Sequence, residues 1–252
     1  MTIDAPKPWQ IPLLRQLWQE AFGDSDAFLD SFFSLGFSAE RCRCVTEEDR
    51  VTAALYWFDC SCDGRKMAYL YAVATEKDSR GRGLCRMLME NTHAHLGQMG
   101  YLGTILVPAT EPLREMYGKM GYSPGTTVSS LRCGAREGTV GLKILDRLAY
   151  ERRRRELLPA GGVLQEGAMT ALLQDQMGLF GGDDFILAAW VEDGVLHGEE
   201  LLGSVASAPE IVSALRAEKG VFRIPGGDEP FAMYCPLADD CPGPDYFGLA
   251  MG

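Results

Sequence analysis

The stretch from Met67 to Leu96 constrains the fold of this 252-residue chain more than any other part. It begins with MAYLYAVAT at 67–75, an apolar run that predicts a strand buried on both faces in the middle of a sheet. A short polar loop with Arg80-Gly81-Arg82-Gly83 follows, and then an amphipathic helix. Because the next apolar segment, 101–107, reads as another central strand, the connection predicts a parallel strand–helix–strand unit.

The loop in this unit predicts a ligand with a diphosphate. The first turn of a helix has unpaired N–H groups and the positive end of the helix dipole, and glycines let an anion come close to the backbone. The two arginines add positive charge. The loop is neither a Walker loop nor a dinucleotide fingerprint, because Gly81-Arg82-Gly83 is followed by Leu84-Cys85-Arg86.

Composition narrows the class of protein. With 46% hydrophobic residues the chain can bury one large core or two modest ones, and no apolar run is long enough to span a membrane. The N-terminal segment lacks the pattern of a secretory signal, so we expect a cytoplasmic protein. A net charge of −11 argues against nucleic-acid binding. The eight cysteines include no Cys-x-x-Cys spacing, so no metal site is predicted.

Local patterns predict the remaining elements of a first domain. Apolar residues recur at helical spacing over 9–22 and 26–35, and alternating residues predict strands at 41–45 and 51–58. Thr110 and Pro112 predict the start of a short helix, which Gly121 ends. The segment 126–132 then predicts a strand that closes the first sheet and completes the domain.

The second half of the chain has a different composition. A helix within 134–160 carries Arg152 to Arg155 between two glutamates, which is typical of a solvated face, although four arginines could also hold an anion or a partner. Beyond it the patterns predict a helix at 165–178, a hairpin at 185–203, a helix at 209–219 and strands at 220–224, 230–236 and 245–250. No phosphate loop is predicted here, because Gly226-Gly227 precede two acidic residues.

Two motifs carry a resemblance to a known family. Arg80-x-x-Gly83-x-Cys85 resembles the coenzyme A loop of the GNAT superfamily of N-acetyltransferases, although Cys85 stands where that family has Gly or Ala. The segment MYGKMGYSP at 116–124 resembles the signature on the last helix of GNAT domains. The combination is most similar to the enhanced-intracellular-survival type, in which a second, degenerate GNAT-like domain follows the first.

The resemblance implies an α/β protein with mixed sheets: a GNAT catalytic domain at 1–134, a helical linker at 135–162 and a smaller GNAT-like domain at 163–252. The usual first strand of the fold would then be confined to Thr2–Asp4. It also implies acetyl-CoA as co-substrate, with main-chain groups of Val73 and Thr75 along the pantetheine arm. The residues implied around the pyrophosphate are Arg80, Gly81, Arg82, Gly83 and Leu84.

Tyr117 matches the tyrosine that serves GNAT enzymes as general acid toward the departing thiolate; the alternative is a core aromatic on a short helix. The base is open, because the strand at 67–75 has no acidic residue. Glu76 lies just beyond it, and Tyr69 and Tyr71 are the polar-tipped side chains within it. By analogy the carboxylate of Gly252 is a candidate, and a water relay is another.

The function that follows is transfer of an acetyl group from acetyl-CoA to a primary amine of a small molecule or peptide. The alternative is a non-catalytic coenzyme A sensor whose C-terminal domain binds a partner, in keeping with the missing carboxylate. We expect a small amine as partner, with no nucleic acid, no membrane and no metal; a homo-oligomer is compatible with the sequence. Neither the acceptor nor a role for Arg152–Arg155 can be named from the sequence.

Overall fold

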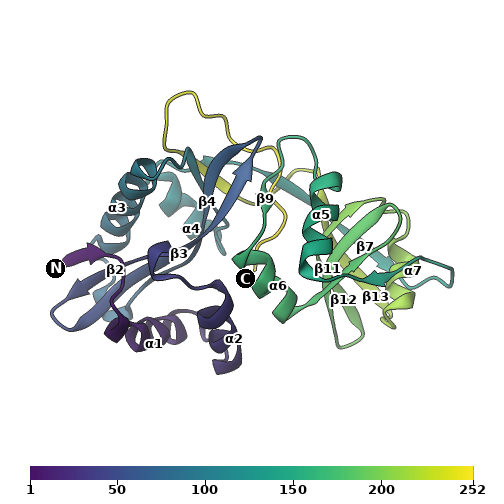
Figure 1. Cartoon of the computed structure of the whole chain (residues 1–252), viewed down its shortest axis with the longest axis horizontal. Helices are drawn as coiled ribbons and strands as arrows, with labels where there is room; N and C mark the ends of the chain where they lie inside the picture. Colours follow the sequence, from purple (N-terminus) through teal and green to yellow (C-terminus); the bar gives the residue numbers. More distant parts are fainter. Residues whose placement is uncertain (252) are drawn as a thin grey trace. The chain divides into compact units, whose positions relative to one another are not determined.

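The chain folds into two compact units (Figure 1), and the computed structural model describes residues 1–251. The first unit is Met1–Ser123 together with Met233–Gly243, and the second is Pro124–Ala232 together with the segment from Pro244 onward. Each unit has its own sheet and its own hydrophobic core. Both sheets combine parallel and antiparallel pairs, so the predicted mixed α/β fold class is confirmed.

The first sheet has the strand order β1-β2-β3-β4-β5-β15-β6. Neighbouring strands are antiparallel along most of it, whereas β4 and β5 are parallel. The strand predicted at the very start of the chain is present as β1. The bounds are β1 Thr2–Asp4, β2 Cys42–Glu47, β3 Arg50–Cys62, β4 Arg65–Thr75, β5 Gly103–Leu106, β6 Ser123–Pro124 and β15 Met233–Pro236.

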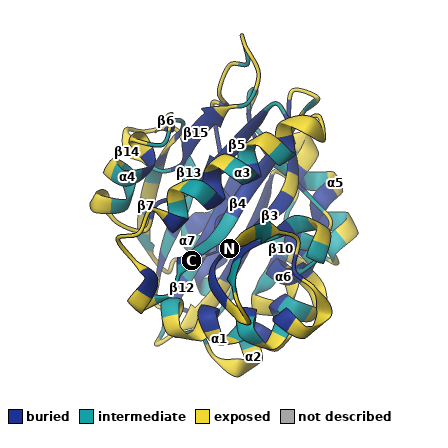
Figure 2. Cartoon of the chain, turned by 90° about the vertical axis from the view of Figure 1, so that its left-hand side faces the viewer, coloured by how far each residue is buried: buried dark blue, intermediate teal, exposed yellow. Residues whose placement is uncertain are grey.

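Short local signals delimit the helices of the first unit. Gly23 ends α1 with a left-handed φ of 74°, and the Ser25 hydroxyl accepts from the Phe28 N–H at the start of α2. Most of β3 and the part of β4 from Met67 to Leu70 are buried, dark blue in Figure 2, in keeping with the apolar run that predicted β4. The helices are α1 Ile11–Phe22, α2 Asp26–Ser31, α3 Leu84–Gln98 and α4 Glu111–Gly118, with a π turn at Phe32–Gly36.

The second sheet has the order β14-β7-β13-β12-β11-β10-β8. Its strands are β7 Thr127–Gly134, β8 Lys143–Ile144, β10 Gly178–Gly181, β11 Phe185–Glu192, β12 Val195–Gly203, β13 Lys219–Pro225 and β14 Glu229–Pro230. The short strand β9, Leu164–Gln165, is not part of this sheet. The helices are α5 Arg147–Leu157, α6 Ala168–Gln176 and α7 Ala208–Ala214. Among residues 1–251, no helix has the length and apolar character of a membrane span.

Two predicted strands belong to the other sheet. The segment predicted to close the first sheet forms β7, but it pairs with β13 and β14 in the second. The first sheet is instead continued by β15, which pairs with β5 and had been predicted as part of the second domain. The strand predicted at 245–250 is wrong, since Tyr246 makes only an isolated bridge to Gly162. Alternation reveals that a segment is a strand but not which strand it pairs with.

The second unit repeats the central topology of the first. In each, an antiparallel pair with a register shift precedes a helix and a strand parallel to the second member of that pair: β3, β4, α3 and β5, then β11, β12, α7 and β13. This repetition agrees with the two-domain arrangement expected from the sequence.

Candidate active site

The loop between β4 and α3 has the conformation that an anion site needs. Gly81 and Gly83 have φ of 77° and 79°, a region that side-chain-bearing residues rarely adopt. Gly83 is the N-cap of α3 and offers no side-chain cap, so the first N–H groups of the helix lack that partner. A Cβ built on either glycine would meet no atom within 4 Å. Two left-handed glycines at the uncapped start of a helix are typical of an anion site.

The loop arginines are held by contacts that the sequence does not reveal. Both terminal nitrogens of Arg82 donate to the Glu47 carboxylate, at 2.9 and 2.7 Å, and this pairing holds the pKa of Glu47 below its usual value. Arg80 turns back and donates from Nε to the Thr75 carbonyl at 3.1 Å. The Glu47 contact joins residues 35 positions apart, so no local signal could have found it.

One edge of β4 is open beside this loop. β4 pairs with β5 only from Met67 to Tyr69; beyond Tyr69, the residues Leu70, Tyr71, Ala74 and Thr75 pair only with β3. The β3–β4 register shifts between Ala54 and Tyr56, where Ala72 and Val73 have no ladder partner. A strand that diverges from its parallel neighbour leaves main-chain N–H and C=O groups that an extended ligand can pair with. Val73 lies in this divergent part, and Thr75 ends it.

Tyr117 lies on α4 and is 6% exposed. Burial raises the pKa of its phenol, and the nearby Cys85 thiol adds to that shift. Its ring packs edge-on against Tyr122 at 5.8 Å, and Leu84 and Val73 belong to the same apolar cluster. No hydrogen bond to its hydroxyl is found among residues 1–251. The fold therefore brings the predicted acid together with the strand and the helix of the loop.

The structure places the candidate bases in different surroundings. Glu76 accepts from Arg50, and also from the Ser79 hydroxyl at 2.8 Å; these contacts, the Arg50 one first, lower the pKa of Glu76. A carboxylate held in this way is a weak base. With Glu20 and Arg50 it lines a cavity of about 170 Å³. Tyr69 is buried, Tyr71 is half-buried, and the proposed carboxylate of Gly252 lies outside the described residues.

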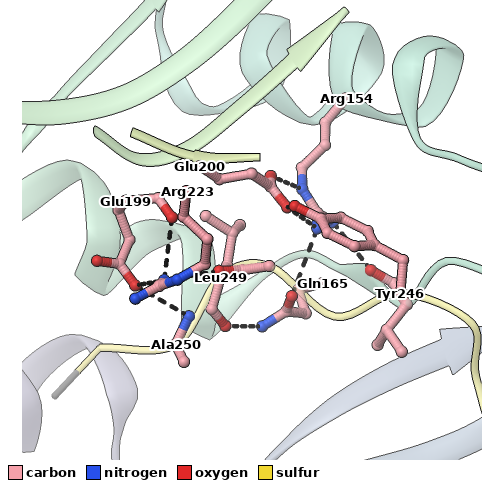
Figure 3. A network of polar contacts seen from close by, with 10 residues as sticks. Arg154, Gln165, Glu199, Glu200, Arg223, Tyr246, Leu249 and Ala250 are labelled. Carbon is pink, nitrogen blue, oxygen red and sulfur yellow. Dashed lines mark hydrogen bonds and ion pairs between the residues drawn. The ribbon is translucent and has the colours of Figure 1, made fainter. Parts of the chain in front are cut away.

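The second unit contains a network of buried charged side chains (Figure 3). Arg154 and Glu200 are fully buried and joined by two hydrogen bonds, of 2.6 and 2.9 Å. Tyr246 donates to the same carboxylate at 3.0 Å, and Arg154 also donates to the Val163 carbonyl. The predicted solvated face of the arginine run is therefore wrong for Arg154. It lies one turn after the buried Tyr150, on the inner side of α5.

Comparisons with known proteins agree with this geometry. Residues 3–125 match the family model described as an acetyltransferase (GNAT) domain. No curated protein sequence matches the chain.

Several solved structures share the fold over 94% of this chain. They include a GCN5-related N-acetyltransferase from Kribbella flavida (18% identity, TM-score 0.72, 72% of that chain) and one from Anabaena variabilis (15%, 0.71, 73%). Eis1 from Mycobacterium abscessus is another (9%, 0.69, 74%). At these identities the likeness shows the fold, and it extends across both units.

Proposed function

We propose that the GNAT acetyltransferase domain formed by residues 3–125 transfers an acetyl group from acetyl-CoA to a primary amine of a small molecule or peptide. The observation that carries the proposal is the conjunction of an open β4 edge, a glycine loop at the uncapped start of α3 and a buried tyrosine in one unit. Each feature suits a different part of the reaction: the pantetheine arm, the diphosphate and the departing thiolate.

The residues fit coenzyme A in two places. The N–H groups from Gly81 to Leu84 would bind the pyrophosphate, because Gly81 and Gly83 have left-handed backbone conformations and the start of α3 has no side-chain cap. Arg80 and Arg82 would add charge beside it. Main-chain groups of Val73 and Thr75 would pair with the amides of the pantetheine arm, which orients the thioester. Acetyl-CoA, when bound, supplies that thioester as the acyl donor.

Tyr117 would act as the acid. Its pKa is raised, so the phenol keeps its proton at neutral pH and can donate it to a thiolate as the carbon–sulfur bond breaks. The incoming amine must lose a proton before it attacks, because alkyl ammonium groups have pKa values near 10. With Glu76 held by Arg50, this proton would leave through water or through the carboxylate of Gly252.

The test measures thiol release from acetyl-CoA with a panel of primary amines, on the wild type and on Tyr117→Phe. We expect the variant to lower kcat by about 10²- to 10⁴-fold, the range for loss of a general acid, and to leave the Kd for acetyl-CoA within about twofold. This split follows because the hydroxyl acts on the leaving group and not on the bound cofactor.

Tyr122→Phe is the matched control. It removes a hydroxyl that contacts Thr104 at 2.7 Å and His93 at 2.9 Å, so it should cost about 1 kcal/mol of stability and change kcat little. An unchanged kcat in Tyr117→Phe would remove the acid assignment. Binding of acetyl-CoA without thiol release across the panel would instead favour the sensor function.

A further inference from the structure

The second unit has a cavity that the proposed acetyl transfer does not use. Its volume is about 240 Å³, which suits a small ligand. Strands β7, β11, β12 and β13 contribute most of the lining, and Glu229 and Phe231 complete one side. The side chains that carry the argument are Trp190, His197, Glu199, Arg223 and Glu229.

Glu199 is directed to this cavity by an irregularity in the sheet. Ala188 pairs with Glu200 and Ala189 with Gly198, so Glu199 is the extra residue of a β-bulge. Bulges of this kind re-aim a side chain. Glu199 is 8% exposed yet lines the cavity.

The two carboxylate oxygens of Glu199 differ. Oε1 accepts from Arg223 and from the Ala250 N–H at 3.3 Å. Oε2 has no hydrogen-bond partner among residues 1–251, and Figure 3 shows it without a contact. Burial raises the pKa of this carboxyl, so a charged Glu199 lacks part of its solvation. A cation that reaches Oε2 would supply the missing interaction.

The charges around the cavity favour a cation. Two glutamates face one arginine, which leaves a net charge of −1 in the lining. Arg223 is already committed, because its Nη1 donates to Glu199 and to the Gly248 carbonyl at 2.9 Å and its guanidinium lies 4.3 Å over the Phe231 ring. An anion entering the cavity would meet the unpaired oxygen of Glu199 and the carboxylate of Glu229.

An aromatic wall completes the site. Trp190 and His197 are cross-strand partners whose rings stack at 5.0 Å with an interplanar angle of 11°. Trp190 is 37% exposed and lines the cavity, so its flat face can cover an alkyl chain or attract an ammonium group.

We propose that this cavity binds a small organic ammonium ion, with the ammonium group on Glu199 Oε2 and the carbon chain against Trp190. The site belongs to the second unit and needs no acetyl-CoA. This proposal can therefore be tested independently of the proposed acetyl transfer.

The test is calorimetry on the full chain at pH 7.5 without acetyl-CoA, using n-butylamine, n-butanol and butyrate. The three probes are similar in size and differ in charge. We expect butylammonium to bind and to quench tryptophan fluorescence, with affinity at least tenfold above that of butanol and no binding of butyrate. Equal binding of butanol or butyrate would overturn the proposal.

Glutamine variants show which carboxylate binds the ammonium group. Glu199→Gln keeps the size of the side chain and should weaken butylammonium at least tenfold, whereas Glu229→Gln should weaken it a few-fold. Glu192→Gln, an exposed residue at the end of β11 outside the cavity, should leave the affinity unchanged.

If the Glu199→Gln protein does not fold, two other variants test the site. Trp190→Phe should abolish the fluorescence quenching and keep the calorimetric heat, and Glu229→Gln should still weaken binding. The proposal is wrong if the folded variants at Glu199 and Glu229 bind like the wild type, or if Glu229→Gln and Trp190→Phe both leave the signals unchanged.

Discussion

The carboxyl ends of β4 and β12 occupy equivalent positions in two repeats of one topology, yet they differ in chemistry. β4 ends in Val73, Ala74 and Thr75, with no charge and with an open edge. β12 carries Glu199 and Glu200, which bind Arg223 and Arg154. The same strand–helix–strand arrangement therefore leaves an uncharged, unpaired strand edge in the first unit and carries buried ion pairs in the second, depending on a few side chains.

The helices that follow these strands differ too. α3 has 15 residues and begins after the glycine loop, whereas α7 has seven and follows a loop without glycines at 204–207. The glycine loop that we propose as the phosphate site is therefore present in the first repeat and has no counterpart at the equivalent position of the second.

We expect the largest effect from removal of the buried ion pair between Arg154 and Glu200 in the second unit. Arg154→Met should lower the free energy of unfolding by about 3–5 kcal/mol, because Glu200 would remain buried without its ionic partner. Chemical denaturation measures this loss. Arg155→Met, at the next position but 64% exposed in its pair with Glu166, should change stability by less than about 1 kcal/mol. Equal losses in the two variants would contradict the structural role of Arg154.

The next prediction tests the glycine loop before α3 as the proposed phosphate site. Gly83→Val should raise the Kd for acetyl-CoA about 100-fold, because valine disfavours a φ of 79° and its side chain would occupy the proposed phosphate site. Equilibrium binding measures the change. Gly226→Val, at a φ of 89° and also with no neighbour within 4 Å, is the control in the second unit and should leave the Kd within about twofold. A Kd unaffected by Gly83→Val would exclude this loop as the phosphate site.

A third prediction concerns the pH dependence of stability that His93 on α3 contributes. Burial lowers the pKa of His93 to about 4, so the unfolded chain binds a proton at this residue more readily than the folded one between pH 6.5 and 4. The stability contributed by neutral His93 is present above pH 6.5 and should fall by about 3 kcal/mol on acidification to pH 4.

Denaturation curves across this pH range check the prediction. His93→Phe should flatten the slope, whereas His95→Gln, on the same helix but less enclosed, should keep most of it. An identical slope in His93→Phe would show that another group titrates.

The smallest effect sharpens the role of the loop arginines. Glu47→Gln frees Arg82 from its bidentate partner and should tighten acetyl-CoA binding about two- to fivefold, with a steeper dependence on salt. Binding titrations at two salt concentrations measure it, with Glu48→Gln, an exposed neighbour in the same turn, as control. Weaker binding in Glu47→Gln would mean that Glu47 orients Arg82 toward the ligand.

Local sequence signals predicted much of the first unit. The apolar run of β4, the glycines of the loop and the stripe of α3 each act over a few residues, so their structure follows from periodicity and φ preferences. Tyr117 was singled out as a candidate acid because it lies inside a local motif.

Contacts between distant residues could not be found in this way. Glu47 and Arg82, or Arg154 and Glu200, are brought together only when the sheets assemble. The assignment of catalytic and cofactor residues stays a prediction that the variants above test.

The sequence alone predicted the strand, the glycine-containing loop and the helix between Met67 and Leu96, which the structure forms as β4, the loop and α3, and it singled out Tyr117 as a candidate acid. The tertiary structure decided which strands complete each sheet, since β7 and β15 lie in the sheets opposite to those predicted. It also decided that Arg154 is a buried charge and that Glu199 faces a cavity. Backbone preferences act between neighbouring residues and can therefore be predicted locally. Strand pairing and ion pairing join residues far apart in the sequence, so they depend on which surfaces the whole fold buries together.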